Sequence, residues 1–329
     1  MLNKVYKRLW KLIIKLTRDT FLYKMLYLSW WHSLYSNTQG NKQNYFSAVP
    51  NKGAGIGHQM ANWIAGYWFT KQFGLKFAHI PFSTSKWDDF LNFGDGEIRV
   101  DDLVNDGYKI VSLPLFDEND KNELGMVKKI IQSYSTQSVV FIAEQDQFYH
   151  DQYGVMSEIK TKFNKLHDND SKLTYDKDYI NIAIHVRRGD ITIGQLNKNP
   201  NLLMRWQDNN YFVNVLQNLL ETLDSSKKVK VYLFSQGVVE DFTEFKDIKN
   251  IEYCLGMNAE DSFLHMIYAD VLITSKSSFS YKPALLSDGI KICPSNFWHG
   301  YPLKDDWILA NEEGSFDTSR IKNKVDADG

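Results

Sequence analysis

The stretch Ile180–Gly194, INIAIHVRRGDITIG, joins strand-like residues to a cluster of charged ones. Adjacent guanidinium groups such as those of Arg187 and Arg188 repel each other and lose hydration unless an anion lies beside them. Successive side chains of an extended segment point to opposite sides, so we expect one arginine to face a ligand. We expect the other to pair with an acid such as Asp190. A diphosphate would meet this need, and the alternative is a salt-bridged pair that only holds a loop.

A second candidate anion site is the segment TSKSSFSY, residues 274–281, which follows a strand-like run and opens a helix-like one. The hydroxyl groups of Ser275, Ser277 and Ser278 would gather there with the first amide groups of the helix. Lys276 and Lys282 add positive potential. The alternative is a helix capped by one serine, which explains one hydroxyl group and not the cluster.

The glycine-rich segment GAGIGHQ, residues 53–59, matches a phosphate-binding loop only in part. It lacks the later glycine and the acidic residue about twenty positions on that a dinucleotide site needs. Gly53, Gly55 and Gly57 would instead let the backbone approach a ligand held by another domain. His58 would then face that ligand, although a histidine that opens a helix is more often a cap or a solvent contact.

The elements that position these residues follow an α/β pattern. In the second half, three helix-like segments alternate with strand-like ones and predict a doubly wound parallel sheet. Ligands of such sheets lie at the carboxyl ends of the strands, where His185, Ser235 and Ser275 fall. Strands are expected at 179–186, 229–235, 270–275 and 290–293, and helices near 208–223 (with Asp208 as N-cap), 259–268 and 278–288.

The first half also alternates, and it opens with a strand, a glycine turn, a helix and a strand, which predicts a βαβ unit. A chain of 329 residues suits two domains. The polar stretch 164–178 has no periodicity and marks the boundary. We predict a helical segment at 1–40 and domains at 41–170 and 171–329; in the first half, strands are expected at 45–49, 75–82, 108–113 and 138–144, and a helix at 60–73.

The N-terminal segment has a composition of its own. Residues 1–26 carry seven basic residues and the single acid Asp19, while apolar residues recur at helical spacing on another face. Charges interrupt the segment too often for a membrane span, and no cleavage site of a signal peptide follows. The helix would lie on an anionic lipid surface or pack on the protein itself. Nucleic-acid binding is disfavoured because the rest of the chain is acidic.

Three motifs together resemble a known family. HVRRGD is similar to the HxRRxD motif of the α-1,2-fucosyltransferases of glycosyltransferase family 11, which α-1,6- and protein O-fucosyltransferases share more loosely. TSKSSFSY resembles the SSFS motif of that family, and GIGHQM resembles its GxGNQM motif. The motifs occur in the family's order and span residues 53–286. Their ordered combination is more specific than any one of them.

The resemblance implies a GT-B-like architecture, in which two Rossmann-like domains with parallel sheets face a cleft. The first domain would hold the acceptor and the second GDP-fucose, and the reaction would invert the sugar without a metal or other cofactor. Arg187 would bind the β-phosphate and stabilise the charge on departing GDP. The donor would also be held by His185, Arg188, Asp261 as a guanine partner, Ser277, Ser278, Phe279, Gly55 and Gly57.

Two positions depart from the family pattern. His58 stands where the family has Asn, and Ser235-Gln236-Gly237 stands where Ser-Asp-Asp is frequent. A neutral imidazole is an adequate base near neutral pH, so His58 is a candidate for activating the acceptor hydroxyl. The predicted catalytic residues are Arg187, His58 and Asp190. The triplets DND, DKD and DAD lie in polar segments, which disfavours a metal-dependent enzyme.

We expect a bacterial-type α-1,2-fucosyltransferase that acts on a glycan such as a surface-polysaccharide intermediate. If that acceptor is lipid-linked, residues 1–35 would hold the enzyme at the cytoplasmic face of the plasma membrane. Cys254 and Cys293 have no metal-ligand spacing and are expected as buried free thiols, which suits a reducing compartment. Trp63, Tyr67 and Trp68 would line an acceptor groove or belong to the core. The alternatives are another nucleotide-sugar transferase on the same fold, or a non-catalytic glycan-binding protein associated with a membrane.

Overall fold

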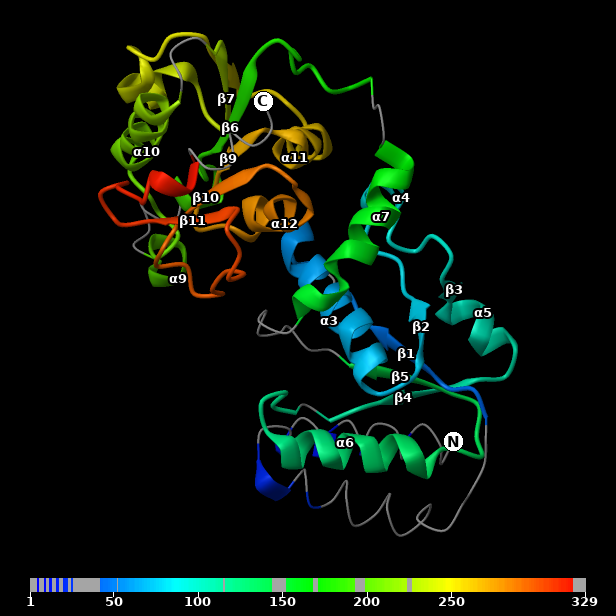
Figure 1. The fold of residues 1–329 in the computed structure, drawn as a ribbon. Coiled ribbons are helices and arrows are strands. Elements are labelled where there is room, and N and C mark those ends of the chain that lie inside the picture. The colour runs from blue at the N-terminus through cyan, green and yellow to red at the C-terminus, as the bar shows by residue number, and fades with distance from the viewer. Residues whose placement is uncertain are drawn as a thin grey trace. The chain divides into compact units, whose positions relative to one another are not determined.

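The computed structural model has two compact units, each built around its own parallel sheet (Figure 1). The first comprises Met1–Ala54 and His58–Gln147, and the second Gly55–Gly57 and Phe148–Gly329. Both sheets are parallel throughout, which confirms the predicted α/β class with two Rossmann-like sheets. That the units face a cleft stays a prediction. The structure describes residues 42–51, 53–114, 116–143, 152–167, 171–192, 199–223 and 227–321, with scattered residues between 5 and 25.

The sheet of the first unit has the order β3-β2-β1-β5-β4. The strand order reverses between β1 and β5, so the loop that leaves β1 lies where ligands of such sheets bind. Strand β5 is buried on both faces, because Phe141 packs in one apolar cluster and Val140 in another. The strands are β1 (Tyr45–Ala48), β2 (Lys76–His79), β3 (Ile98–Arg99), β4 (Lys109–Ser112) and β5 (Val139–Ala143), and the helices α3 (Ile56–Gln72), α4 (Ser85–Leu91), α5 (Val100–Asn105) and α6 (Lys121–Ser133).

Helix α3 begins at Ile56, whereas the sequence pattern predicted a start at residue 60. Most of the GIGHQM segment is therefore the first turn of a helix and not a loop. The buried side chain of Gln59 stabilises this turn, since its Nε2 donates to Ala54 O at 2.9 Å and to Ser83 Oγ at 2.7 Å. Its Oε1 accepts from Ser83 N at 2.9 Å. The helix propensity of the local sequence does not predict such contacts between distant segments.

The sheet of the second unit has the order β11-β10-β9-β6-β7-β8. Strands β7 and β8 extend it on one side of β6 and β9–β11 on the other, so the order reverses between β6 and β9. The strands are β6 (Ile180–His185), β7 (Val229–Phe234), β8 (Ile251–Cys254), β9 (Val271–Ile273), β10 (Ile290–Pro294) and β11 (Trp307–Ala310). The helices are α7 (Met156–His167), α9 (Pro200–Leu203), α10 (Asn209–Thr222), α11 (Ala259–Tyr268) and α12 (Ser278–Leu286), with 3₁₀ segments η1 (Gln152–Val155) and η2 (Val239–Phe245).

Most predicted elements of this unit are found. Asp208 caps α10 as expected, since its Oδ1 accepts from Asn210 N at 2.9 Å. Helix α11 has the predicted bounds, and α12 begins at the predicted residue. Strands β8 and β11 were not predicted. They are the edge strands of the sheet and are four residues long each, and the exposed Glu252 interrupts the apolar pattern of β8.

Helix α7 belongs to the second unit, so the predicted boundary near residue 170 falls inside that unit. Lys160 on this helix bonds to the end of α12, because its Nζ donates to Ser287 O at 2.9 Å and to Asp288 Oδ1 at 2.6 Å. Most of the residues 171–178 are exposed, and this polar stretch does not mark the boundary between units.

Little of the predicted N-terminal helix lies within the described residues. Those that do include Val5, Leu9, Leu12 and Leu16, which are helical and each more than half exposed. The basic residues of the segment lie outside the described part, so the amphipathic helix stays a prediction. Across the described residues, no helix has the length and apolar character needed to cross a bilayer.

Candidate functional site

The reversal of strand order in the second sheet brings two predicted site residues into contact. His185 ends β6, and its Nδ1 lies 2.8 Å from the Oγ of Ser275, which follows β9. Ser235 follows β7, and its hydroxyl donates to Val186 O at 2.6 Å. Three carboxyl-edge loops thus meet where α/β sheets bind ligands.

A cavity of about 270 Å³ opens at this edge. The ring of Phe279 forms part of its wall, with its centroid 5.4 Å from that of the His185 ring. The wall combines guanidinium, imidazole and hydroxyl groups with apolar surface, a composition that suits a polar ligand with an aromatic part. The lining residues are His185, Val186, Arg187, Arg188, Asp190, Phe234, Ser235, Gln236, Met257, Ala259, Ser262 and Phe279.

Arg187 bridges the end of β6 and the start of α12. Its Nη1 donates to Ser277 Oγ at 3.1 Å, and its Nη2 donates to both carboxylate oxygens of Asp190 at 3.0 and 2.9 Å. Its Nε is buried and has no hydrogen-bond partner among the described residues. The guanidinium group therefore keeps unused donor capacity beside the cavity.

The partner of Asp190 differs from the expectation. We predicted that this acid would pair with the arginine that faces away from the ligand, but it pairs with Arg187. The cause is the turn at Gly189, where a φ of +72° ends the extended conformation and returns the chain toward Arg187. Strand alternation therefore does not continue as far as Asp190.

Arg188 has separate surroundings. Its Nη1 donates to Arg187 O at 2.8 Å, its Nη2 donates to Asn209 Oδ1, and its Cζ lies 4.0 Å from the ring centroid of Trp206. Burial lowers the pKa of Arg188, and the neighbouring carboxylates, Asp208 above all, oppose that shift. These contacts support a structural role, and the predicted donor contact of Arg188 stays a prediction.

Ser277 is the N-cap residue of α12. Its Oγ accepts from Phe279 N at 3.2 Å as well as from Arg187 Nη1, so its own hydroxyl hydrogen can be donated elsewhere. Ser278 and Phe279 are the first residues of the helix, where amide groups carry partial positive charge. The geometry supports anion binding here, and the individual roles of these residues stay predictions.

His185 is a neutral imidazole over the physiological range. Burial, followed by the positive charges of Arg187 and Arg188, lowers its pKa to about 3. A neutral ring can hold a hydrogen bond to Ser275 and present an apolar face to a ligand. It is not a proton donor at neutral pH.

Asp261 lies in the first turn of α11 and is absent from the lining of the cavity. One of its carboxylate oxygens accepts from Asn258 Nδ2 at 2.6 Å, and the other lies 3.9 Å from Lys172 Nζ. The carboxylate therefore has partners within the protein. Its predicted contact with guanine stays a prediction.

The glycine-rich segment divides between the two units. Gly55 and Gly57 cluster with the second unit, and His58 clusters with the first. His58 is the third residue of α3 and is half-buried. The donor contacts of the glycines and the role of His58 as a base stay predictions.

Trp63 belongs to the core, which is one of the two places that the sequence left open for it. Its side chain is 1% exposed, and its Nε1 donates to His79 Nδ1 at 3.0 Å. Tyr67 stacks on Trp63 with ring centroids 5.1 Å apart and is half-buried, as is Trp68. The spacing of these three aromatic residues along the helix did not indicate which of them is buried.

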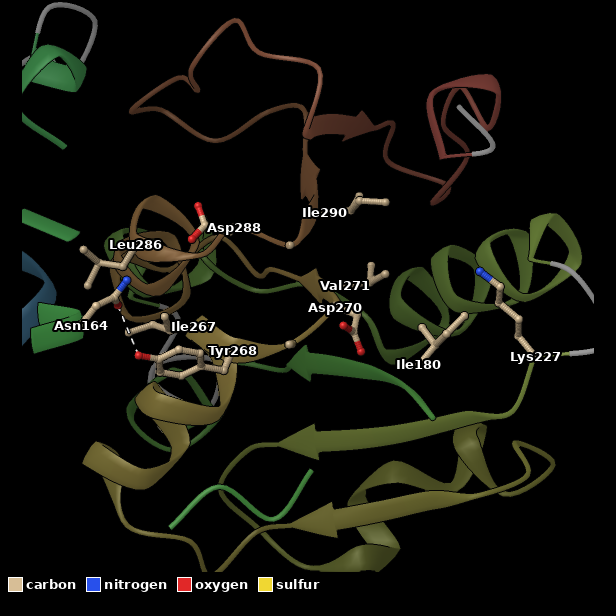
Figure 2. A pocket seen from close by; sticks show the side chains of 12 residues that line it. Asn164, Ile180, Lys227, Ile267, Tyr268, Asp270, Val271, Leu286, Asp288 and Ile290 are labelled. Carbon is tan, nitrogen blue, oxygen red and sulfur yellow. Dashed lines mark hydrogen bonds between the residues drawn. The ribbon is translucent and has the colours of Figure 1, made fainter. Parts of the chain in front are cut away.

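A larger cavity, about 400 Å³, lies at the opposite edge of the second sheet (Figure 2). Ile180, Val271 and Ile290 line it at the first residues of β6, β9 and β10. The carboxylate of Asp270 accepts from Asn181 N at 2.8 Å, so it already has a partner. Polar residues such as Lys227 and Asp288 also line this cavity, but it lies at the amino ends of the strands. Ligands of α/β sheets bind at the carboxyl ends, so the smaller cavity is the better candidate site.

Sequence inspection missed Arg205, which follows α9 and lies within electrostatic range of Arg187 and Asp190. No motif surrounds it, and only the folded chain brings it to this edge. No group of three or more His, Cys, Asp or Glu side chains in the described part of the chain could hold a metal ion.

No family model and no curated protein matches the sequence. Solved structures match at low identity. POFUT1 in its apo form shares 12% identity over 77% of this chain and 96% of that chain, with a TM-score of 0.47. The Bradyrhizobium fucosyltransferase NodZ shares 14% over 80% and 98%, with a TM-score of 0.43. The E. coli heptosyltransferase WaaC with ADP shares 9% over 96% and 81%, with a TM-score of 0.35.

Proposed function

We propose that the protein is a glycosyltransferase that moves L-fucose from GDP-β-L-fucose to a hydroxyl group of a glycan, with inversion. The observation that carries this proposal is the hydrogen bond from Arg187 to Ser277 at the start of α12. It joins the two motifs that resemble those of fucosyltransferases, at the edge where α/β sheets bind ligands. A guanidinium group and helix amides at one place suit a diphosphate.

In the proposed reaction, an acceptor hydroxyl oxygen attacks the anomeric carbon of fucose. The bond from that carbon to the β-phosphate oxygen breaks, and GDP leaves with the electron pair. Negative charge grows on the β-phosphate, where Arg187 and the Ser277 hydroxyl would stabilise it. The proton of the acceptor hydroxyl passes to a base, and His58 is the candidate.

We propose that no metal is needed for this step. Divalent ions in other transferases neutralise the leaving diphosphate. Here the guanidinium group of Arg187, hydrogen-bonded to the N-cap residue of α12, supplies fixed positive charge for the same purpose.

The linkage and the acceptor follow from the sequence resemblance. We propose an α-1,2 linkage to a surface-polysaccharide intermediate, such as an O-antigen precursor. If that acceptor is lipid-linked, the basic N-terminal segment would hold the enzyme peripherally at the cytoplasmic face of the plasma membrane. Flotation of the full chain and a 1–35 deletion with anionic vesicles tests the last point; equal flotation would contradict it.

The test of the activity is a screen of glycan acceptors with labelled GDP-fucose in the presence of a chelator. We expect labelled product from at least one acceptor, and loss of that product in Arg187→Ala with the fold retained. Transfer that needs an added metal would contradict the metal-free mechanism. Unchanged transfer in Arg187→Ala would contradict the proposed role of the site.

Another nucleotide-sugar donor is the second candidate, because the carboxylate of Asp261 is already bonded to Asn258 and does not line the cavity. Thermal unfolding with a panel of nucleotide sugars separates the two. Stabilisation by GDP-fucose above the others supports the first proposal, and stabilisation by a different donor supports the second. No turnover with any donor that binds would instead favour a non-catalytic glycan-binding protein.

A further inference from the structure

Arg205 is fixed at the carboxyl edge of the second sheet by its neighbours. It lies in the segment between α9 and α10, and Arg205 N donates to Leu202 O at 3.1 Å. Two residues on, the buried side chain of Gln207 accepts from Lys276 N at 2.9 Å. This bond ties the segment to the turn that leads into α12, on the same side as Ser277.

The guanidinium group of Arg205 has few partners. Its Cζ lies 5.5 Å from the ring centroid of Trp298, in the loop after β10. Its Nε is buried and has no hydrogen-bond partner among the described residues. Burial is the main cause of its lowered pKa, followed by the positive charge of Arg187.

The charges at this place do not balance. Arg187 and Arg205 lie within electrostatic range of each other, and Asp190 pairs with Arg187 and also attracts Arg205. Lys276 belongs to the turn that Gln207 holds. Glu312 acts on Lys276 only at a distance. Arg187 and Arg205 each hold a buried Nε without a hydrogen-bond partner among the described residues, and burying a donor without a partner costs free energy. A dianionic ligand would satisfy both.

We propose that Arg205 is a second donor-binding arginine, which binds the diphosphate of the nucleotide sugar together with Arg187. This inference rests on the proposed function, because the ligand is the donor of that reaction. Two arginines near the start of one helix can each bind one of two linked phosphate groups, whereas a single phosphate group would leave one arginine without an anion. Arg205 therefore favours a nucleoside diphosphate over a monophosphate.

The experiment is calorimetric titration of the full chain with GDP, GMP and guanosine. The variants are Arg205→Gln and Arg205→Lys, and the control is Lys249→Gln, which removes an exposed positive charge near the start of β8. We expect Arg205→Gln to lower the affinity for GDP by about tenfold to a hundredfold. The affinity for GMP should fall much less, and the affinity for guanosine should not change. Arg205→Lys should recover part of the loss, and Lys249→Gln should match the wild type.

Equal GDP affinity in the wild type and Arg205→Gln would overturn the inference and leave the proposed function standing. An equal loss of affinity for GDP and for guanosine in Arg205→Gln would also overturn it, since it would show that Arg205 has only a structural role. If the wild type binds no GDP, the proposed function fails. Titration with inorganic pyrophosphate, which has no guanine, then tests Arg205. Weaker binding of pyrophosphate by Arg205→Gln than by the wild type supports the diphosphate site. Equal binding by the two proteins, or no binding, overturns it. Thermal unfolding of each variant checks that it is folded.

Discussion

The guanidinium group of Arg188 lies over the indole ring of Trp206, with Cζ 4.0 Å from the ring centroid. Its neighbour Arg187 turns instead to Asp190 and Ser277. Two adjacent residues of the same type therefore have different surroundings. One guanidinium group is packed into the second unit, and the other keeps donor capacity beside the cavity.

The first prediction separates these two arginines by stability. Arg188→Ala leaves Asn209 Oδ1 without its partner and removes the positive charge near three carboxylates, so we expect a loss of about 3 kcal/mol in the free energy of unfolding. Arg187→Ala should cost less than about 1 kcal/mol, because its ion pair with Asp190 is partly exposed. Urea unfolding measures both, and similar losses would contradict the separate roles.

The second prediction concerns acid stability through His185. Its pKa lies near 3 in the folded protein and near 6.5 in the unfolded chain. The unfolded chain therefore binds the proton first, and stability falls as the pH drops through the window from about 6.5 to about 3. At pH 5 this residue should account for a loss on the order of 2 kcal/mol relative to pH 7.

His185→Asn removes that titration, so its stability should decline less between pH 7 and pH 5 than that of the wild type. Urea unfolding across this range measures the difference. Parallel curves for the two proteins would show that the histidine is not held neutral.

The third prediction concerns the thiols. Cys254 and Cys293 are buried and unbridged, as the sequence predicted, and burial raises the pKa of each to about 12. The reactive thiolate is therefore scarce near neutral pH. A thiol reagent should modify neither residue in the folded protein and both after denaturation. Rapid modification of the native protein would contradict these surroundings.

The fourth prediction concerns the buried network of the first unit. The indole N–H of Trp63 can only donate, so Nδ1 of His79 accepts, and its Nε2–H donates to Asp88 Oδ1 at 3.0 Å. Trp63→Phe leaves a buried acceptor unsatisfied and should cost about 1–3 kcal/mol. Trp68→Phe is the control, because no hydrogen bond of its indole is found in the described part of the chain. Equal thermal destabilisation of both variants would contradict the network.

The sequence predicted much of the second unit for physical reasons. Strands such as β6 are buried on both faces, so their apolar runs are continuous and easily recognised. The start of α12 was predictable because Ser277 is a residue type favoured at N-caps and follows the apolar strand β9 after a short turn. The proximity of His185 and Ser275 followed from topology alone, since parallel strands end at one edge.

What the sequence missed depends on contacts between distant segments. Gln59 extends the start of α3 through Ser83, and Gln207 ties the Arg205 segment to the turn before α12. Neither contact leaves a pattern in the residues around it. The sequence left open whether Trp63 lies in a groove or in the core, because a helical spacing does not say which face is buried.

The last prediction is that Arg187 binds the diphosphate of a nucleotide sugar at the carboxyl edge of the second sheet. Calorimetric titration of the wild type and Arg187→Gln with GDP tests it most directly, because binding is measured without an acceptor. We expect the wild type to bind GDP, and a folded Arg187→Gln to bind it with an affinity about tenfold to a hundredfold lower. The same affinity in both proteins would contradict it.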